Sequence, residues 1–99
     1  MKAVLTSEAK DNLERICDYI AQDNPVRADS FVDELIDKIR LIAETPQGFP
    51  LVPRYAHLGI RRRVYGAYLI FYRVDADRVS ILHILHGARD YEALLFPEE

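Results

Sequence analysis

Residues 60–91 have the sequence IRRRVYGAYLIFYRVDADRVSILHILHGARDY, and this stretch decides the fold of the chain. Residues 67–74 (AYLIFYRV) carry β-branched, aromatic or aliphatic side chains at nearly every position, which is typical of a strand covered on both faces. Gly66 marks one hairpin turn and residues 75–78 mark a second. The pattern therefore predicts three consecutive strands near 60–65, 67–75 and 78–86. Helices can cover only one face of so small a sheet, so the other face is closed by loops or kept for a partner.

Two helices are predicted ahead of these strands. Residues 2–6 form a short apolar strand, and Thr6 or Ser7 then caps a helix whose buried stripe consists of Leu13, Ile16, Cys17 and Ile20. Asn24 caps a second helix with Pro25 at its first position, and this helix ends near Thr45, before Pro46. Residues 46–59, which are rich in proline and glycine, form a long loop. The chain is thus predicted to be a single α+β domain spanning residues 1–99. Its order is βααβββ, with an N-terminal helical hairpin packed on a small antiparallel sheet.

Composition narrows the class of protein. The lone Cys17 excludes an internal disulfide, and its position in an apolar helical pattern favours a packed residue over a reactive thiol. No apolar segment is long enough for a signal peptide or a membrane span, so we expect a cytoplasmic protein. The net charge of −3 argues against general nucleic-acid binding.

The three consecutive arginines alternate between the faces of their strand, and two arrangements are open. A three-residue loop at residues 65–67 would place Arg61 and Arg63 on the face of Leu69, Phe71 and Arg73. A two-residue turn would instead place both arginines with Ile70 and Tyr72. Charges that protect an edge strand from aggregation are the structural alternative to a binding surface.

A polar cluster follows the last predicted strand. His86 stands there beside Arg89, Asp90 and Tyr91, at a strand end where functional sites are often built. The alternative is that Asp90 caps a last helical turn and pairs with Arg89. His83 points to the opposite face from His86 and is expected to be a packed histidine. No cysteine or carboxylate stands at ligand spacing from the histidines, and no cofactor-binding motif occurs, so we expect neither a metal nor a cofactor.

The whole layout resembles the ParE branch of the ParE/RelE superfamily, the toxins of bacterial type II toxin–antitoxin systems. The resemblance covers almost the full chain. It is carried by the runs LERICDYIAQDNPVRADSFVDELIDKIRLIAETPQGFP, IRRRVYGAYLIFYRVD and ILHILHGARD. It implies a cognate, ParD-like antitoxin wrapped around the toxin. For ParE-like members it also implies DNA gyrase as the target.

RelE-like members of the superfamily instead cut mRNA on the ribosome through a cluster of basic residues and a tyrosine or histidine. Such a centre would draw here on Arg61, Arg73, His86, Arg89 and Tyr91. RelE-like enzymes place an arginine where Leu69 stands and lysines on the preceding strand, and this chain has neither. The resemblance therefore favours a gyrase poison without catalytic residues. A RelE-like mRNA endonuclease and a non-toxic interaction module of the same fold are the alternatives.

Two surfaces follow from this hypothesis. The surplus of apolar residues at 67–74 and the arginines before them predict an antitoxin-binding surface made of Arg61, Arg63, Leu69, Phe71 and Arg73. The end of the chain, with apolar residues among charges, predicts a target-binding surface made of His86, Arg89, Tyr91, Leu94, Leu95 and Phe96. The alternative for the second set is that it docks back on the core as a last helical turn.

Overall fold

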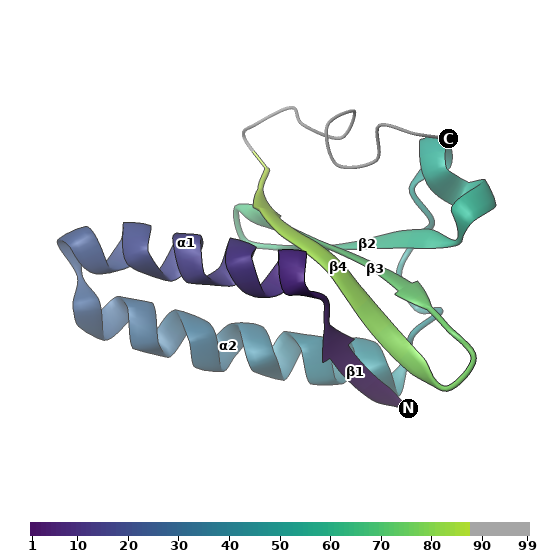
Figure 1. Ribbon diagram of the computed structural model, residues 1–99, viewed down its shortest axis with the longest axis horizontal. Helices are drawn as coiled ribbons and strands as arrows, with labels where there is room; N and C mark the ends of the chain where they lie inside the picture. The colour runs from purple at the N-terminus through teal and green to yellow at the C-terminus, as the bar shows by residue number, and fades with distance from the viewer. Residues whose placement is uncertain (88–99) are drawn as a thin grey trace.

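A computed structural model describes residues 1–87 of the chain (Figure 1). The elements are β1 (Lys2–Leu5), α1 (Ser7–Asp23), α2 (Pro25–Glu44), a 3-10 segment η1 (Pro53–Leu58), β2 (Ile60–Tyr65), β3 (Tyr68–Val74) and β4 (Arg78–His86). The predicted α+β class and the order βααβββ are confirmed. None of the helices in this part of the chain is long and apolar enough to cross a lipid bilayer.

Both predicted helix starts are confirmed by their capping geometry. The Thr6 hydroxyl oxygen accepts a hydrogen bond from the backbone N–H of Ala9 at 3.1 Å and caps α1. The Asn24 side chain accepts one from the N–H of Arg27 at 3.0 Å, with Pro25 in the first turn of α2. These caps satisfy N–H groups that have no partner inside a helix. The two helices are thus joined at Asn24 as an antiparallel hairpin.

The sheet has the strand order β1-β4-β3-β2. Strands β2, β3 and β4 are antiparallel as predicted, whereas β1 pairs with β4 in parallel, so the sheet is mixed rather than wholly antiparallel. Parallel neighbours need a long connection, and here the helical hairpin, β2 and β3 all lie between β1 and β4 in the sequence. The parallel pairing extends only from Lys2↔Arg78 to Leu5↔Ile81, so β1 covers the first half of β4.

A β-bulge shapes the middle of β4. The register passes from Phe71↔His83 to Tyr72↔Ile81, which leaves Leu82 as the extra residue. Strict alternation would place Ile81 and Ile84 on opposite faces. The bulge lets both isoleucines enter the core beneath the helices.

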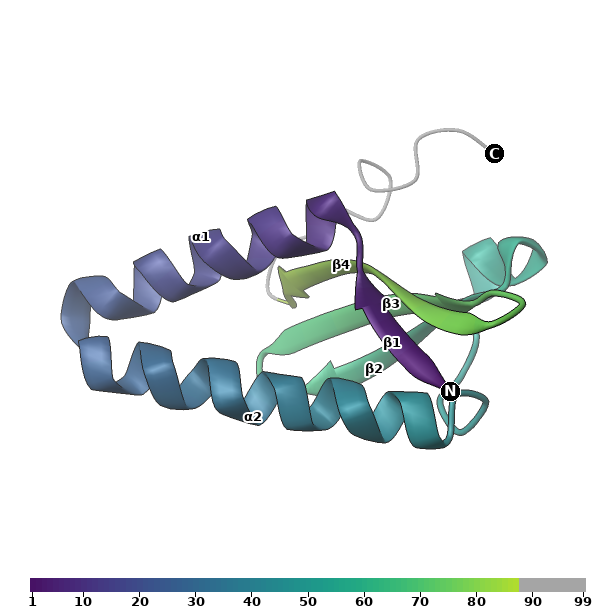
Figure 2. The ribbon, with the colours of Figure 1, turned by 60° about the horizontal axis from the view of Figure 1, so that its bottom comes forward.

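The helices cover one face of the sheet, and their hairpin extends past it on one side (Figure 2). The core beneath them consists of Ala9, Phe31, Leu35, Ile39, Ile42, Ile70, Tyr72, Val79, Ile81 and Ile84. The predicted stripe of α1 is only half-buried, and the residues of α1 that become fully buried are Ala9 and Asn12. Leu13, Ile16 and Ile20 of this stripe nevertheless pack against the core, so the predicted inner face of α1 is confirmed. Much of α1 lies on the part of the hairpin that projects beyond the sheet.

The opposite face of the sheet is closed by a smaller core. Val52, just before η1, and Tyr55, within η1, pack with Ile60 and Phe71. Leu69, Leu82 and Leu85 lie against this cluster and are partly buried. Among the described residues, η1 and the loop before it thus cover one end of this face. The partly buried Leu69 and Leu85 lie nearer the β2–β3 turn.

Candidate functional site

The turn between β2 and β3 decides which face carries the arginines. Tyr65 pairs directly with Tyr68, which leaves Gly66 and Ala67 as a two-residue turn. Gly66 has φ of +58° while Ala67 does not have a positive φ, and this combination fits a type II′ hairpin turn. Arg61 therefore pairs with Tyr72 and Arg63 with Ile70, and both arginine side chains lie on the helix-covered face.

Arg61 and Arg63 contact the protein itself on that face. The Arg61 guanidinium donates a hydrogen bond to the carbonyl of Phe49 at 2.6 Å. The Arg63 guanidinium lies 4.7 Å from the centre of the Phe49 ring and donates to the carbonyl of Lys38 at 3.4 Å. The two arginines thus attach the loop at Phe49 and the second half of α2 to the sheet.

The remaining members of the predicted antitoxin surface lie on the opposite face. Phe71 is fully buried in the smaller core, so it exposes no surface to a partner. Leu69 is partly buried at the edge of that core, and Arg73 forms an exposed ion pair with Asp75 at 3.0 Å. The five residues therefore do not form one surface. A role in antitoxin binding stays a prediction for Arg61 and Arg63 on one face and for Leu69 and Arg73 on the other.

The residues assigned to a RelE-like centre are not brought together either. Arg73 pairs with Ile60 at one end of the sheet, whereas His86 pairs with Tyr68 at the other end. The five-residue separation along β3 corresponds to about 17 Å. Arg61 lies at the Arg73 end but on the opposite face. Arg89 and Tyr91 lie outside the described residues, as do Leu94, Leu95 and Phe96.

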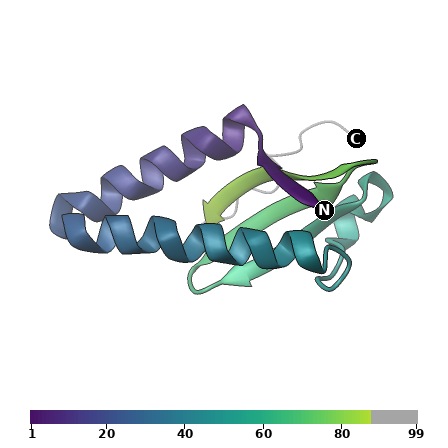
Figure 3. The ribbon, with the colours of Figure 1, turned by 90° about the horizontal axis from the view of Figure 1, so that it is seen from below.

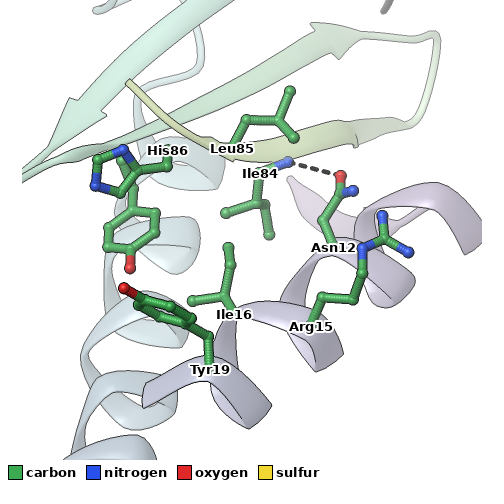
Figure 4. A pocket seen from close by; sticks show the side chains of 8 residues that line it. Asn12, Arg15, Ile16, Tyr19, Ile84, Leu85 and His86 are labelled. Carbon is green, nitrogen blue, oxygen red and sulfur yellow. Dashed lines mark hydrogen bonds between the residues drawn. The ribbon is translucent and has the colours of Figure 1, made fainter. Parts of the chain in front are cut away.

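His86 instead lines a pocket of about 500 Å³ between α1 and the end of β4. The pocket is lined by Asn12, Arg15, Ile16, Tyr19, Tyr68, Ile84, Leu85 and His86. Figure 4 shows that Arg15 and Tyr19 line it from α1 and that His86 lines it from β4. The ring of His86 meets that of Tyr68 edge-on, with centroids 5.3 Å apart. The pocket combines aromatic faces, a guanidinium and an imidazole, which suits a partner with both apolar and acidic groups.

Asn12 joins the two walls of this pocket, α1 and β4, by a hydrogen bond. Its side-chain oxygen accepts a hydrogen bond from the backbone N–H of Ile84 at 3.1 Å, beyond the point where β1 stops covering β4. The Thr6 hydroxyl lies beside the same strand edge and contacts the carbonyl oxygens of Ile81 and Leu82 at 3.0 and 3.1 Å. The start of α1 thus replaces the missing strand partner. Our sequence reasoning did not identify Asn12, although its spacing from Ala9 and Ile16 places it on the inner helix face.

A second polar cluster joins α2 to the end of β2. Glu34 accepts hydrogen bonds from Arg27, at 2.9 Å, and from the hydroxyl of Tyr65. The hydrogen bond from Arg27 and that from Tyr65 lower the pKa of Glu34, whereas the hydrogen bond to Glu34 raises the pKa of Tyr65. The Lys38 ammonium lies 5.7 Å from the centre of the Tyr65 ring. Near neutral pH this cluster is an ionised carboxylate among cations, which fixes α2 on β2.

Burial alters the titration of groups elsewhere in the fold. Burial lowers the pKa of His83, and Glu8 partly offsets this effect, so neutral imidazole is favoured as expected for a packed histidine. Burial raises the pKa of the Cys17 thiol, which reduces the thiolate needed for reactivity. Within residues 1–87, no three metal-ligating side chains lie together in a group that would hold a metal ion.

Comparisons with known proteins agree with this architecture. The family model described as "ParE toxin of type II toxin-antitoxin system, parDE" matches residues 3–91. A solved structure titled "Chromosomal ParDE TA system from P. aeruginosa" contains a chain similar to this one, with 22% sequence identity and a TM-score of 0.73. That similarity covers 87% of this chain and 95% of the other, and it concerns the fold. The comparison with curated proteins gives no match. The family model spans nearly the whole sequence, and the chain therefore belongs to the ParE toxin family of type II toxin–antitoxin systems.

Proposed function

We propose that this chain poisons DNA gyrase in the bacterial cytoplasm, arrests growth, and is neutralised by a cognate ParD-like antitoxin. The observation that carries the proposal is membership of the ParE family over residues 3–91. The assignment of gyrase as the target rests on the family resemblance. The assignment of an antitoxin rests on the toxin–antitoxin system that the family model names.

The arrangement of the basic residues supports a toxin that acts without cleaving RNA. Cleavage needs a base for the 2′-hydroxyl, an acid for the leaving oxygen and cations beside the developing charge, all at one phosphate. Arg73 lies at one end of β3 and His86, on β4, lies beside the other end, and the Leu69 side chain offers no hydrogen-bond donor. Loss of one such donor costs about 3–4 kcal/mol of transition-state stabilisation in comparable sites.

The target contact that we infer begins at the pocket beside His86 and continues into residues 89–96. Arg15 and Tyr19 of α1 enlarge the surface assigned from the sequence, because they line the same pocket as His86. Tyr19 is 68% exposed, which is high for a large aromatic side chain with no role in the core.

The decisive experiment pairs two assays on the purified chain. The first measures DNA supercoiling by gyrase and the accumulation of cleaved DNA; the second measures mRNA cleavage on translating ribosomes. We expect loss of supercoiling with cleaved DNA and intact mRNA. Addition of the proposed ParD-like antitoxin should restore supercoiling.

Two results would overturn the proposal in different ways. Cleavage of mRNA on ribosomes with gyrase unaffected would identify a RelE-like endonuclease. An absence of growth arrest on induction of the chain alone, with gyrase and mRNA both unaffected, would identify an interaction module that has lost toxicity. A double substitution of Arg15 and Tyr19 by alanine tests the target surface, with the exposed Lys10→Ala as the matched control on the same helix.

A further inference from the structure

The outer edge of β2 is covered over only part of its length. The loop before η1 pairs with its beginning, through a hydrogen bond from the N–H of Val52 to the carbonyl of Ile60 at 2.9 Å. The N–H of Arg62 donates to the carbonyl of Pro50 at 3.1 Å. The ladder cannot continue past this point, because Pro50 has no N–H and the preceding chain turns back at Gly48, whose N–H bonds to the carbonyl of Thr45.

The next backbone N–H and C=O that point away from β3 belong to Val64. Successive residues of a strand direct their N–H and C=O to alternate sides, and the loop bonds show that residues 60 and 62 face outward. The pairing of β2 with β3 is regular from residue 60 to 65, so Val64 faces outward as well. Within residues 1–87, no loop, strand or side chain bonds to these two groups, and the residue is 60% exposed.

The side chains beside this edge are apolar on one face of the sheet and cationic on the other. On the face away from the helices, Val64 pairs with Leu69 and Leu69 with Leu85, which forms an apolar row across three strands. On the helix-covered face the edge meets the cations Arg63 and Lys38. The two carboxylate oxygens of the nearby Glu34 are directed to Arg27 and to the Tyr65 hydroxyl.

An open strand edge can pair with another strand, and the nearby cations Arg63 and Lys38 favour a strand that carries acidic side chains. A second copy of this chain is disfavoured, because antiparallel pairing of β2 with itself would bring two arginine runs together. An acidic strand has the complementary charge. We propose that an extended acidic segment of the antitoxin adds a fifth strand beside β2 at Val64.

The added strand would have a recognisable pattern. The residue opposite Val64 is apolar and extends the row of Val64, Leu69 and Leu85. A neighbouring residue, on the helix-covered face, is acidic and faces Lys38 and Arg63. Backbone hydrogen bonds supply affinity, and these two side chains supply specificity. The inference rests on the proposed function, since the incoming strand belongs to the antitoxin.

The test uses Val64→Pro, which removes the outward N–H and keeps an apolar side chain. Proline is tolerated on an edge strand where the N–H faces away from the sheet. Val64→Thr keeps the N–H and serves as the matched control. With the proposed ParD-like antitoxin as the probe, we expect Val64→Pro to weaken binding about tenfold, the loss from one hydrogen bond. We expect Val64→Thr to bind within about threefold of wild type.

Amide hydrogen exchange of the wild-type chain provides a second readout that needs no variant. The Val64 amide should exchange fast in the free toxin and slowly in the complex. A bound antitoxin that leaves this amide unprotected overturns the added strand while leaving the proposed function intact. If the ParD-like protein does not bind at all, the proposed antitoxin itself fails.

The charge selection is tested separately with Lys38→Glu. This change should weaken binding, because it places an acid beside the acidic strand. Lys10→Glu makes the same charge change on exposed α1 and should leave the affinity unchanged. Equal affinities of the two variants would overturn the assignment of an acidic strand.

Discussion

Asn12 illustrates at the scale of one residue how a polar side chain can complete a sheet. Among residues 1–87 it is a buried polar residue in a core made mostly of apolar side chains. Its amide oxygen takes the place of a strand at the N–H of Ile84, where β1 no longer reaches. The same contact places α1 against the pocket wall, so a structural hydrogen bond also positions Arg15 and Tyr19.

Replacement of Asn12 by alanine should lower the free energy of unfolding by about 1–3 kcal/mol, because the buried Ile84 N–H loses its acceptor. Urea unfolding of the purified variant measures this loss. Asp11→Ala, one residue away and exposed, is the control and should change stability by less than about 0.5 kcal/mol. Equal stabilities of the two variants would contradict the role assigned to Asn12.

Glu34 gives the fold a pH dependence. The hydrogen bonds from Arg27 and Tyr65 hold its pKa below the ordinary value in the folded state. The unfolded chain therefore binds a proton first as pH falls, and stability is lost from the ordinary glutamate pKa of about 4.3 downward. Above that pH the stabilisation is fully present.

Urea unfolding across this acidic range should show a shallower decline for Glu34→Gln than for wild type. The decline should not vanish, because Asp75 and Asp77 also have lowered pKa values, from hydrogen bonds with Ser80 and Arg78 respectively. Tyr65→Phe removes one of the two bonds to Glu34 and should give an intermediate slope. Identical slopes for all three proteins would show that the cluster does not contribute.

At the scale of the element, the junction at Asn24 serves both helices. Its side chain caps the start of α2, and its backbone N–H bonds to the carbonyl of Ile20 at the end of α1, at 2.9 Å. A side-chain substitution therefore removes the first contact and keeps the second. The hairpin depends on this junction because its outer part lies beyond the sheet (Figure 3).

Asn24→Ala should cost about 1 kcal/mol of stability, the usual effect of losing an N-cap. Asn24→Asp retains an acceptor oxygen, adds a favourable charge at the helix start, and should remain close to wild type. Denaturant unfolding followed by circular dichroism measures both variants. A stability of Asn24→Ala equal to wild type would indicate that tertiary packing alone holds this end of α2.

At the scale of the whole molecule, the sheet separates two kinds of surface. The helices cover one face of the sheet, while η1 and its loop close one end of the other face. The pocket beside His86 and the open edge at Val64 both lie toward the end of the sheet with the β2–β3 turn, on opposite flanks. Under the two proposals above, the target and the antitoxin would therefore bind at separate places on the chain.

This separation predicts that the two activities can be divided by truncation. Deletion of residues 91–99 should abolish toxicity, because it removes Tyr91, Leu94, Leu95 and Phe96, and should leave antitoxin binding intact. The described fold ends before this segment and is expected to remain folded. Deletion of residues 97–99 alone keeps the apolar residues and is the control. Growth assays and antitoxin titration measure both; full toxicity of the longer truncation would place the target contact elsewhere.

The sequence by itself determined the two helices, their caps and the existence of all four strands. Helical periodicity, the Asn24–Pro25 start and the two hairpin turns act between residues near one another in the chain, so their physics can be evaluated from the sequence. Leu69 could likewise be identified as a departure from the RelE-like pattern, because that comparison needs only a position.

The tertiary structure alone decided which residues meet. The face of Arg61 and Arg63 depends on whether the turn at Gly66 has two or three residues, and a change of one residue reverses every side chain of the strand. The parallel pairing of β1, the contact of Asn12 with Ile84 and the separation of Arg73 from His86 join positions far apart in the sequence. No local pattern records such distances, because they arise only when the elements pack around a common core.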